Sequence, residues 1–235
     1  MGKYTKYHLH DDTSNVNGFF DSASSYEDYI KLAKRDGDSA IAFSNHGGMY
    51  DWIKKKLSCD KHGIKYIHGI EAYMCRELEF KESFHIGLYS KNLEGVKELN
   101  LLISKSFSKD DGHFYKRQRV SMAEIMNTSD NIIITTACIM SMLAKLPKDS
   151  YTKEFIEWMS KNSNRCFLEV QYHDHELQVN YNKYLCDISK KYNIRLIAGT
   201  DTHSANEYIA KCRKIVQISK DSYYGDEDSF DLTWK

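Results

Sequence analysis

The chain has 235 residues, and 33 lysine and arginine residues balance 33 aspartate and glutamate residues, so its formal net charge is zero. This balance disfavours a strongly basic nucleic-acid-binding protein and an acidic disordered protein as descriptions of the whole chain. Hydrophobic residues make up 41% and aromatic residues 13%, which predicts a folded globule with one sizeable core or at most two small ones.

Short β-rich runs alternate with longer amphipathic segments along the chain. The predicted strands are 5–10, 39–44, 65–74, 84–90, 131–137, 165–171 and 195–200. The predicted helices are 25–36, 49–62, 92–106, 121–127, 153–162, 176–192 and 206–219. This alternation indicates an α/β fold with a parallel sheet. The length suits a (β/α) barrel, and a doubly wound open sheet is the alternative, which periodicity does not distinguish from the barrel.

Two predicted helices begin with the signature of a capping box, in which a hydroxyl residue is followed three positions later by an acid. Ser121 with Glu124 is one candidate, and Ser24 with Glu27 is the other. Both signatures precede apolar residues at helical spacing, so we expect helices to start there.

Side chains that bind transition metals stand at the C-terminal ends of the predicted strands. Residues two apart on a strand face the same way, so His8 should lie beside His10, and Asp201 beside His203. Other strand ends carry further candidates: Asn45, His46, Glu71, His85 and Cys138. Imidazole, carboxylate and thiolate are the ligand set of first-row transition metals. The sequence therefore predicts a metal centre at these strand ends.

The same segments resemble the motifs of the PHP (polymerase and histidinol phosphatase) family. The motifs are HLHDDTS at 8–14, IAFSNHG at 41–47, HGIEAY at 68–73, HIGL at 85–88, TTAC at 135–138 and AGTDTH at 198–203. They are similar in particular to the N-terminal PHP domains of bacterial and phage DNA polymerase III alpha subunits, over essentially the whole chain. The resemblance implies a distorted (β/α)7 TIM-like barrel with up to three metals at its C-terminal face.

Carried over by motif, the resemblance implies nine metal ligands: His8, His10, Asn45, His46, Glu71, His85, Cys138, Asp201 and His203. Within this set it implies catalytic roles for Glu71, Asp201 and His10. One position departs from the family, which usually has Asp where this chain has Asn45. An amide brings no negative charge, so we expect one metal to bind more weakly and an Asp restored at this position to raise metal affinity or rate.

Residues 114–120, FYKRQRV, resemble the tyrosine- and arginine-bearing segment of the same family. We predict that Arg119, with Arg117 or Lys116, binds the substrate phosphate through charge-assisted hydrogen bonds. Phe114 and Tyr115 could stack on a base. A solvated basic loop and ordinary core packing are the alternatives for these two groups of residues.

A site of this kind suits phosphoester hydrolysis with two to three divalent metals, and its nitrogen and sulfur ligands favour Zn, Mn or Fe over Mg. The resemblance implies a 3′–5′ exonuclease that acts on DNA 3′ ends, single-stranded or primed, and proofreads for a replicative polymerase. One alternative is a non-catalytic PHP module that stabilises a polymerase and contacts replication subunits. Another is a small-molecule phosphatase of the histidinol-phosphatase type. Eight of the nine ligand positions match, which favours the enzyme.

The sequence also predicts domain organisation and compartment. We assign residues 1–220 to the barrel and 221–235, with five acids and one base, to an acidic extension that could start a linker to a polymerase region. The chain shows no signal peptide, and its most apolar run, 132–143, is far shorter than the ~20 residues of a membrane span. Six scattered cysteines indicate free thiols. We expect a cytoplasmic protein without a membrane association.

Overall fold

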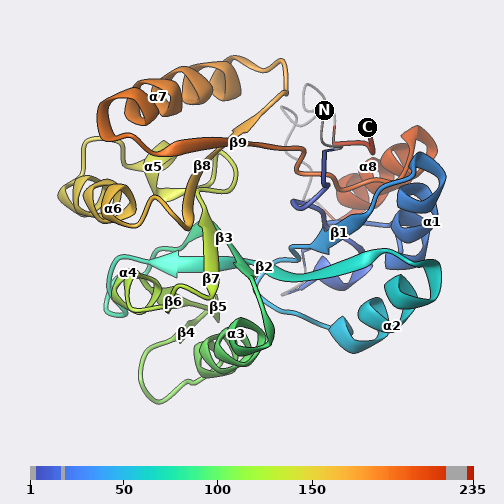
Figure 1. Ribbon diagram of the computed structural model, residues 1–235, viewed down its shortest axis with the longest axis horizontal. Coiled ribbons are helices and arrows are strands. Elements are labelled where there is room, and N and C mark those ends of the chain that lie inside the picture. The colour runs from blue at the N-terminus through green and yellow to red at the C-terminus, as the bar shows by residue number, and fades with distance from the viewer. Residues whose placement is uncertain (1–3, 17–18, 221–231) are drawn as a thin grey trace. The chain divides into compact units, whose positions relative to one another are not determined.

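The computed structural model describes residues 4–16, 19–220 and 232–235 (Figure 1). The chain forms two compact units, and each of them is described by itself below. Unit 1 comprises residues 1–70 and 200–235, and unit 2 comprises residues 71–199. Unit 1 is therefore built from both ends of the chain, and unit 2 is continuous in sequence.

Unit 1 contains three α-helices, α1 (Tyr26–Asp36), α2 (Trp52–His62) and α8 (Glu207–Ser219), within its described residues, and a short 3-10 turn at Asp12–Ser14. Strand β1 (Ala40–Phe43) pairs in parallel with the first part of β2 (Lys65–Cys75). The core between these elements consists of buried apolar side chains: Leu9, Tyr29, Ile30, Ala33, Ile41, Phe43, Cys59, Ile64, Ala205 and Trp234.

Unit 2 contains the end of β2 and one continuous sheet with the order β2-β3-β7-β8-β9, in which β6 also pairs with β2. The strands are β3 (Phe84–Ser90), β6 (Val120–Ser121), β7 (Ile132–Thr135), β8 (Cys166–Gln171) and β9 (Arg195–Gly199). The helices are α3 (Leu93–Ser106), α4 (Met122–Met126), α5 (Met142–Lys145), α6 (Ser150–Lys161) and α7 (Glu176–Tyr192). A small hairpin of β4 (Phe114–Tyr115) and β5 (Arg117–Gln118) stands outside this sheet.

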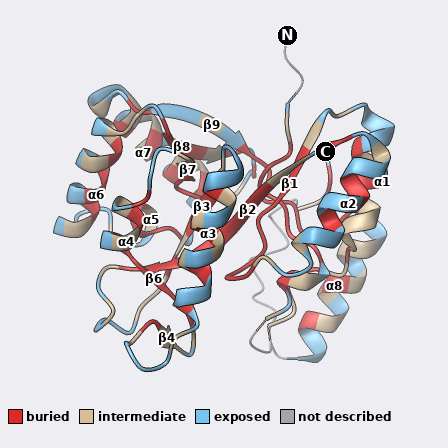
Figure 2. Cartoon of the chain, turned by 60° about the horizontal axis from the view of Figure 1, so that its bottom comes forward, coloured by how far each residue is buried: buried red, intermediate tan, exposed pale blue. Residues whose placement is uncertain are grey.

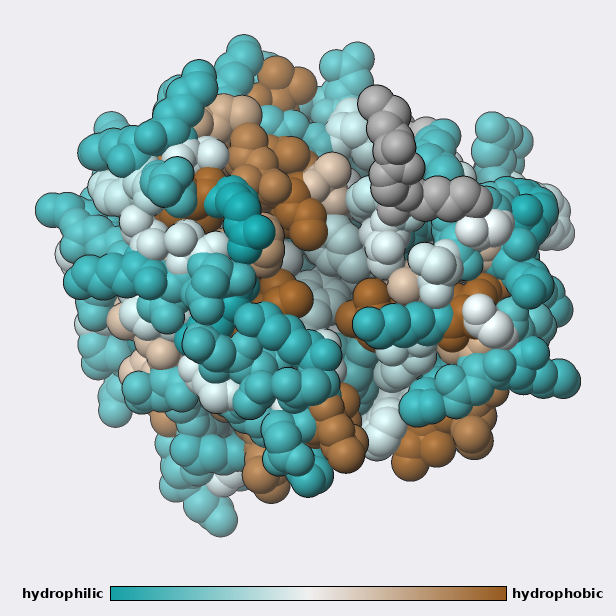
Figure 3. All heavy atoms as spheres, viewed as in Figure 1, coloured by the Kyte–Doolittle hydropathy of each residue, from teal (hydrophilic) through white to brown (hydrophobic). Residues whose placement is uncertain are grey.

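Burial follows the expected amphipathic pattern in each unit. Figure 2 shows that most strand residues are buried and that the helices carry their exposed residues on their outer faces. Hydrophilic side chains cover most of the surface visible in Figure 3, with apolar side chains in scattered patches. Within the described residues, no helix combines the length and the apolar character that crossing a bilayer requires.

The α/β class predicted from the sequence is confirmed. The predictions of a strand at 5–10 and of a wholly parallel sheet are wrong. Residues 5–10 form only isolated bridges, Lys6 with Ile41 and Leu9 with Thr202, because this segment passes between two partners and pairs only briefly with each. The sheet is also not wholly parallel, since β3 pairs antiparallel with β7. Two consecutive strands that run parallel need a long crossover connection, usually a helix. The short link between β2 and β3 contains no helix and does not provide such a crossover.

The capping predictions have different outcomes. Ser121 and Glu124 form the predicted capping box at the start of α4. The box at the start of α1 lies one residue later than predicted, because Ser25 is the N-cap and Asp28 accepts from its backbone amide. All six cysteines are free thiols, as the sequence predicted.

A buried polar network in unit 2 requires a glycine on the last strand. Glu169 is fully buried, and its carboxylate accepts hydrogen bonds from Thr135 Oγ1 at 3.0 Å and from Gln171 Nε2 at 3.0 Å. A Cβ atom on Gly199 would overlap the carboxylate of Glu169. Because Gly199 has no side chain, the carboxylate of Glu169 can occupy this space.

We expect Gly199→Ala to lower the free energy of unfolding by about 1–3 kcal/mol, because the added methyl group must displace a fixed carboxylate. Urea denaturation of the variant and the wild type measures this change. Glu169→Ala removes the group that the new Cβ meets, so Gly199→Ala should cost less in that background. If Gly199→Ala lowers the free energy of unfolding equally in both backgrounds, Glu169 is not the group that the added methyl displaces.

Candidate metal-binding clusters

The backbone of residues 8–10 lies between two segments of unit 1. On one side, Leu9 N donates to Ser44 Oγ at 2.9 Å and Ser44 N donates to Leu9 O at 2.8 Å. On the other side, His10 N donates to Thr202 O at 2.8 Å and Thr202 N donates to His8 O at 3.1 Å. Extended backbone sends Leu9 into the apolar core and turns the two histidines the other way.

His8 and His10 point the same way, as their spacing predicted, and both meet the carboxylate of Asp201. Nε2 of His8 lies 3.1 Å from Oδ1 of Asp201, and Nε2 of His10 lies 3.4 Å from the same oxygen. Both imidazoles are fully buried, and Asp201 is nearly so. These three side chains form one group of potential metal ligands.

Asp21 lies at the centre of a second group, which the sequence analysis missed. Its Oδ1 lies 3.2 Å from Nε2 of His203 and 3.6 Å from Nε2 of His46, and its Oδ2 lies 3.4 Å from Nδ1 of His10. The imidazole of His10 stacks on that of His203 with ring centroids 4.3 Å apart. The four residues form a buried set of potential ligands that shares His10 with the first group.

The loop around Asp21 is built to hold that carboxylate in place. Asn15 Oδ1 accepts from the backbone amide of Asp21 at 2.6 Å and from that of Ser22 at 3.0 Å. Arg213 and Gln217 of α8 donate to the carbonyl oxygens of Asp21 and Phe20, the second at 3.0 Å. The sequence signal was only an acid in the first loop, where Asp11 and Asp12 were equal competitors, and no strand end marks it.

The separations between these atoms suit a shared cation. Ligand atoms at about 2.1 Å from a tetrahedral metal lie about 3.4 Å from one another. The carboxylate oxygens of Asp21 lie 3.2–3.6 Å from imidazole nitrogens of His46, His203 and His10. All ligand atoms of this set lie within 4.8 Å of one another. Imidazole nitrogen and carboxylate oxygen form a donor set for Zn, Mn or Fe. The residues present therefore fit a divalent transition metal.

The protonation states in this cluster favour cation binding near neutral pH. Burial opposes ionisation of Asp21, but the charges of His203 and His46 and their hydrogen bonds outweigh it, so its pKa lies well below its usual range. The pKa of Asp201 is also held well below that range, because His8 and His203 outweigh the effect of burial. Burial, reinforced by His203 and His46, lowers the pKa of His10 to about 4.

Backbone strain marks two positions among the predicted ligands. Asp201 has φ 47° and Ala137, immediately before Cys138, has φ 53°, both in the left-handed region that disfavours residues with a side chain. Such conformations cost on the order of 1–3 kcal/mol and cluster at functional sites. In unit 1 the hydrogen bonds of Thr202 to the 8–10 segment hold Asp201 in this conformation.

Within unit 2, Glu71, His85 and Cys138 lie side by side. Nδ1 of His85 lies 3.1 Å from Oε1 of Glu71 and 3.3 Å from Sγ of Cys138. The amide of Met140 donates to the same sulfur at 3.4 Å. Glu71 is buried at the end of the first half of β2, and His85 begins β3. The carboxyl, imidazole and thiol groups of three predicted ligands thus come together.

Comparison with known proteins identifies the family of the chain. Residues 6–173 match the family described as PHP domain. The chain belongs to the PHP family. Among curated relatives, the DNA polymerase III alpha subunit of Borreliella burgdorferi is 32% identical over 226 residues, and that of Aquifex aeolicus is 27% identical over 220 residues. The matches cover 91% and 86% of this chain but only 19% and 18% of those relatives.

Two solved structures share the fold of this PHP chain. A protein of Bifidobacterium adolescentis assigned as a metal-dependent phosphoesterase matches with a TM-score of 0.54 and 12% identity, covering 85% of this chain and 87% of that one. An amidohydrolase of Chromobacterium violaceum, with bound sulfate and no metal, matches with a TM-score of 0.53 and 11% identity, covering 87% and 89%. The predicted α/β fold of the distorted TIM-like barrel type is thereby confirmed.

The two arginines predicted to bind phosphate have different surroundings in unit 2. Arg119 is buried, and its guanidinium donates to backbone carbonyl oxygens, including Leu78 O at 2.9 Å and Gly112 O at 2.7 Å. It holds two loops together, and its donors are engaged there. Arg117 is partly exposed and stacks over Tyr73, whose ring meets His85 edge-on with centroids 5.4 Å apart. Arg117 is therefore the better placed of the two.

The side chain of Asn45 forms hydrogen bonds with the loop that follows His10. Its amide oxygen is engaged there and does not point toward the histidine cluster. Its Oδ1 accepts from the amide of Asp11 at 2.9 Å, and its Nδ2 donates to Asp11 Oδ1 at 2.8 Å and to Thr13 Oγ1 at 2.7 Å. Asp11 also pairs at 2.7 Å with Lys55, which is almost fully buried and whose pKa is lowered by burial against the opposing effect of Asp11. The negative charge next to Asn45 thus comes from Asp11.

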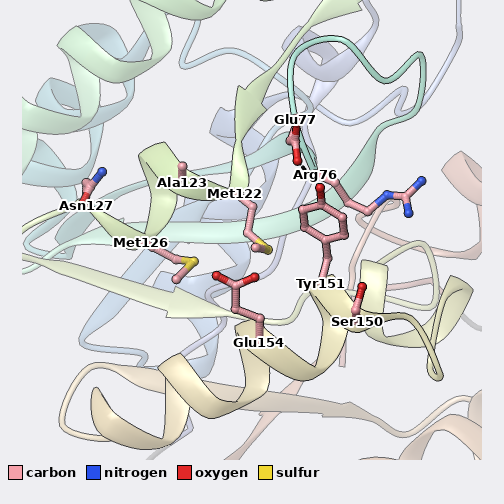
Figure 4. Close-up of a pocket in the computed structure, with 9 residues that line it drawn as sticks. All are labelled: Arg76, Glu77, Met122, Ala123, Met126, Asn127, Ser150, Tyr151 and Glu154. Atoms are coloured by element: carbon pink, nitrogen blue, oxygen red, sulfur yellow. Dashed lines mark hydrogen bonds between the residues drawn. The ribbon is translucent and has the colours of Figure 1, made fainter.

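Unit 2 also contains a cavity. Its volume is about 640 Å³, and residues of α4 and α6 line it together with Arg76 and Glu77 (Figure 4). The guanidinium of Arg76 is engaged by Glu82 and Asp149, and none of the predicted ligands lines the cavity. We assign no chemistry to it.

The hydrogen bonds of Asn45 reverse the effect expected from the sequence for an Asp at this position. Asn45→Asp would bring a second carboxylate within hydrogen-bond distance of the buried Asp11, so we expect a loss of at least about 2 kcal/mol in the free energy of unfolding and no gain in metal affinity. Urea denaturation and Mn²⁺ titration measure the two effects.

The double variant Asp11→Asn/Asn45→Asp keeps one carboxylate and one amide, and serves as the matched control. It should be more stable than Asn45→Asp alone. Tighter Mn²⁺ binding by Asn45→Asp at unchanged stability would contradict the structural account and support the sequence-based expectation.

The low pKa of His10 predicts a pH-dependent stability of the metal-free protein. With a pKa of about 4 in the folded state and about 6.5 when unfolded, His10 takes up its proton first in the unfolded chain. The free energy of unfolding should therefore fall as the pH drops from about 6.5 toward 4, by up to about 3 kcal/mol. Urea denaturation in chelator at about pH 7 and about pH 5 measures this fall, and His10→Asn should reduce it. An identical pH slope in His10→Asn would show that other groups cause it.

Proposed function

We propose that the chain is a metal-dependent phosphoesterase that removes nucleotides from the 3′ ends of DNA. The observation that carries this proposal is the buried group of four histidines and two carboxylates in unit 1, because a structural core does not need such a set. Membership in the PHP family and the likeness to a fold assigned as a metal-dependent phosphoesterase support the hydrolytic part. The DNA part rests on the relatives, which are DNA polymerase III alpha subunits.

The roles of the residues follow from their protonation and position. Asp21 and Asp201 provide negative charge for cations, and His8, His10, His46 and His203 provide nitrogen ligands. In unit 2, Glu71, His85 and Cys138 would hold a further cation. When bound, such metals polarise a phosphoester and lower the pKa of a coordinated water. This gives two to three metals as the expected content, with Zn, Mn or Fe favoured by the donor set.

The β4–β5 hairpin of unit 2 is our candidate for contacting the nucleic acid. Lys116, at its turn, has φ 61° and lies with Lys81 near the ring of Tyr115, at 5.8 and 5.9 Å from its centroid. Arg117 follows directly and stacks over Tyr73. Positive charge beside aromatic rings is the usual composition of a surface that binds single-stranded nucleic acid. We assign Arg117 to the substrate phosphate in preference to Arg119.

The two alternatives make different demands on the site. A non-catalytic PHP module that stabilises a polymerase needs no buried ligand cluster, so the complete set in unit 1 favours the enzyme. A small-molecule phosphatase would use the same ligands but needs no basic and aromatic hairpin. Replication in the cytoplasm, beside a polymerase region or other replication subunits, is the context that the relatives suggest.

The purified protein supplied with Mn²⁺ should shorten single-stranded and primed DNA from the 3′ end. We expect His10→Ala or Asp201→Asn to lower this rate at least about 100-fold, because each removes a ligand. Strands labelled at either end, resolved by electrophoresis, report the rate and polarity, and elemental analysis reports the metal content.

His62→Ala and Asp187→Asn are matched controls, since they make the same kinds of substitution on α2 and α7 and neither residue belongs to a group of candidate metal ligands. Both should retain full activity. Unchanged activity in His10→Ala would point to a contaminating nuclease. A metal-loaded protein that cleaves p-nitrophenyl phosphate and leaves DNA intact would favour the small-molecule phosphatase, and one that cleaves neither would favour the non-catalytic module.

A further inference from the structure

The last described residues, 232–235, pack into unit 1 beside the ligand His203. The amides of His203 and Ser204 donate to Leu232 O at 2.8 and 3.1 Å, and the amide of Trp234 donates back to Ser204 O at 2.9 Å. The sequence analysis placed these residues in an acidic extension, of which 221–231 lie outside the described residues. Residues 232–235 thus add a short pairing directly to the segment that carries a predicted ligand.

Trp234 anchors this pairing through three contacts. Its indole Nε1 donates to Asp36 Oδ2 at 2.8 Å, and its ring stacks on Tyr29 with centroids 5.8 Å apart. The ammonium group of Lys6 lies 4.4 Å from the ring centroid, in the geometry of a cation–π contact. Trp234 is 8% exposed and belongs to the apolar core of unit 1. The side chain therefore fixes residues 232–235 to the body of the unit.

Hydrogen bonds fix both the amide and the carbonyl group of His203. Its amide meets Leu232, and its carbonyl oxygen accepts from Ser22 Oγ at 2.7 Å, next to Asp21 in the chain. Its Nδ1 lies 2.8 Å from the carbonyl oxygen of Asp201, to which it donates. This bond leaves Nε2, which lies 3.2 Å from Asp21, as the nitrogen available to a metal.

We propose that Trp234 is a positioning residue for the metal-binding cluster of unit 1, acting through the pairing of residues 232–235 with His203. The inference rests on the metal-binding part of the proposed function and is independent of the substrate. Hydrogen-bonded groups behind a metal ligand set its orientation, and their loss typically lowers affinity 10–100-fold.

A reciprocal effect follows from thermodynamic linkage. If docking of residues 232–235 strengthens metal binding, then bound metal must strengthen that docking by the same factor. In the polymerase III alpha relatives the chain continues far beyond the matched region, which is less than a fifth of their length. Whatever is joined after this segment would thereby be coupled to metal occupancy.

The test is a Mn²⁺ titration by calorimetry of the wild type, Trp234→Ala and Trp234→Phe. Trp234→Ala should bind the metal of the unit 1 cluster about 10-fold more weakly. Trp234→Phe retains an aromatic ring against Tyr29 and should show a smaller loss. Trp158→Ala is the matched control, because Trp158 stacks on Phe155 within α6 of unit 2, and it should leave the affinity of the unit 1 cluster unchanged.

A second readout tests the reciprocal effect. Metal should slow the release of residues 232–235 by carboxypeptidase in the wild type but not in Trp234→Ala. If Trp234→Ala does not fold, Asp36→Asn, which weakens the acceptor of the indole N–H, should give a smaller loss of affinity in the same direction.

The outcomes separate the two proposals. A wild type that binds no Mn²⁺ would overturn the metal-binding function on which the inference rests. A wild type that binds Mn²⁺ with the same affinity as folded Trp234→Ala, or as Asp36→Asn if Trp234→Ala fails to fold, would overturn the positioning role and leave the metal-binding function standing.

Discussion

The arrangement of unit 1 depends on burying two carboxylates among four imidazoles. Removing Asp21 and Asp201 from water is costly unless positive charge and hydrogen bonds compensate. The surrounding imidazoles provide part of this compensation, which is why both carboxylates have pKa values well below the usual range. A bound divalent cation would provide the rest. The need to bring these groups together explains the strained backbone of Asp201 and the loop that fixes Asp21.

Some side chains predicted from strand ends lie together because a local rule determines their direction. His8 and His10 face one carboxylate because alternate residues of extended backbone share a side, and this holds although residues 5–10 form no regular strand. No such rule determines the direction of Asp21, because loop geometry alone brings its side chain to His46 and His203. The sequence could place an acid in that loop but could not select which one.

The sequence did not indicate the hydrogen-bond partners of two other buried side chains, Asn45 and Arg119. Asn45 was predicted as a ligand by its place in the family motif, but its amide group forms hydrogen bonds with Asp11 and Thr13. Arg119 looked like a phosphate ligand, but it is buried and satisfied by loop carbonyl oxygens, whereas Arg117 stands over Tyr73. Hydrogen bonds across loops depend on tertiary packing, which neither periodicity nor motif spacing reports. For the same reason the pairing of residues 232–235 with His203 was not foreseen.

The central claim is that Asp21, with His10, His46 and His203, binds a transition metal and that Asn45 does not. Anomalous diffraction from crystals grown with Mn²⁺, recorded above and below the manganese absorption edge, tests it most directly. The account predicts a manganese peak within bonding distance of the carboxylate of Asp21 and of imidazole nitrogens around it. No peak at this cluster, or a peak coordinated by the side chain of Asn45, would contradict it.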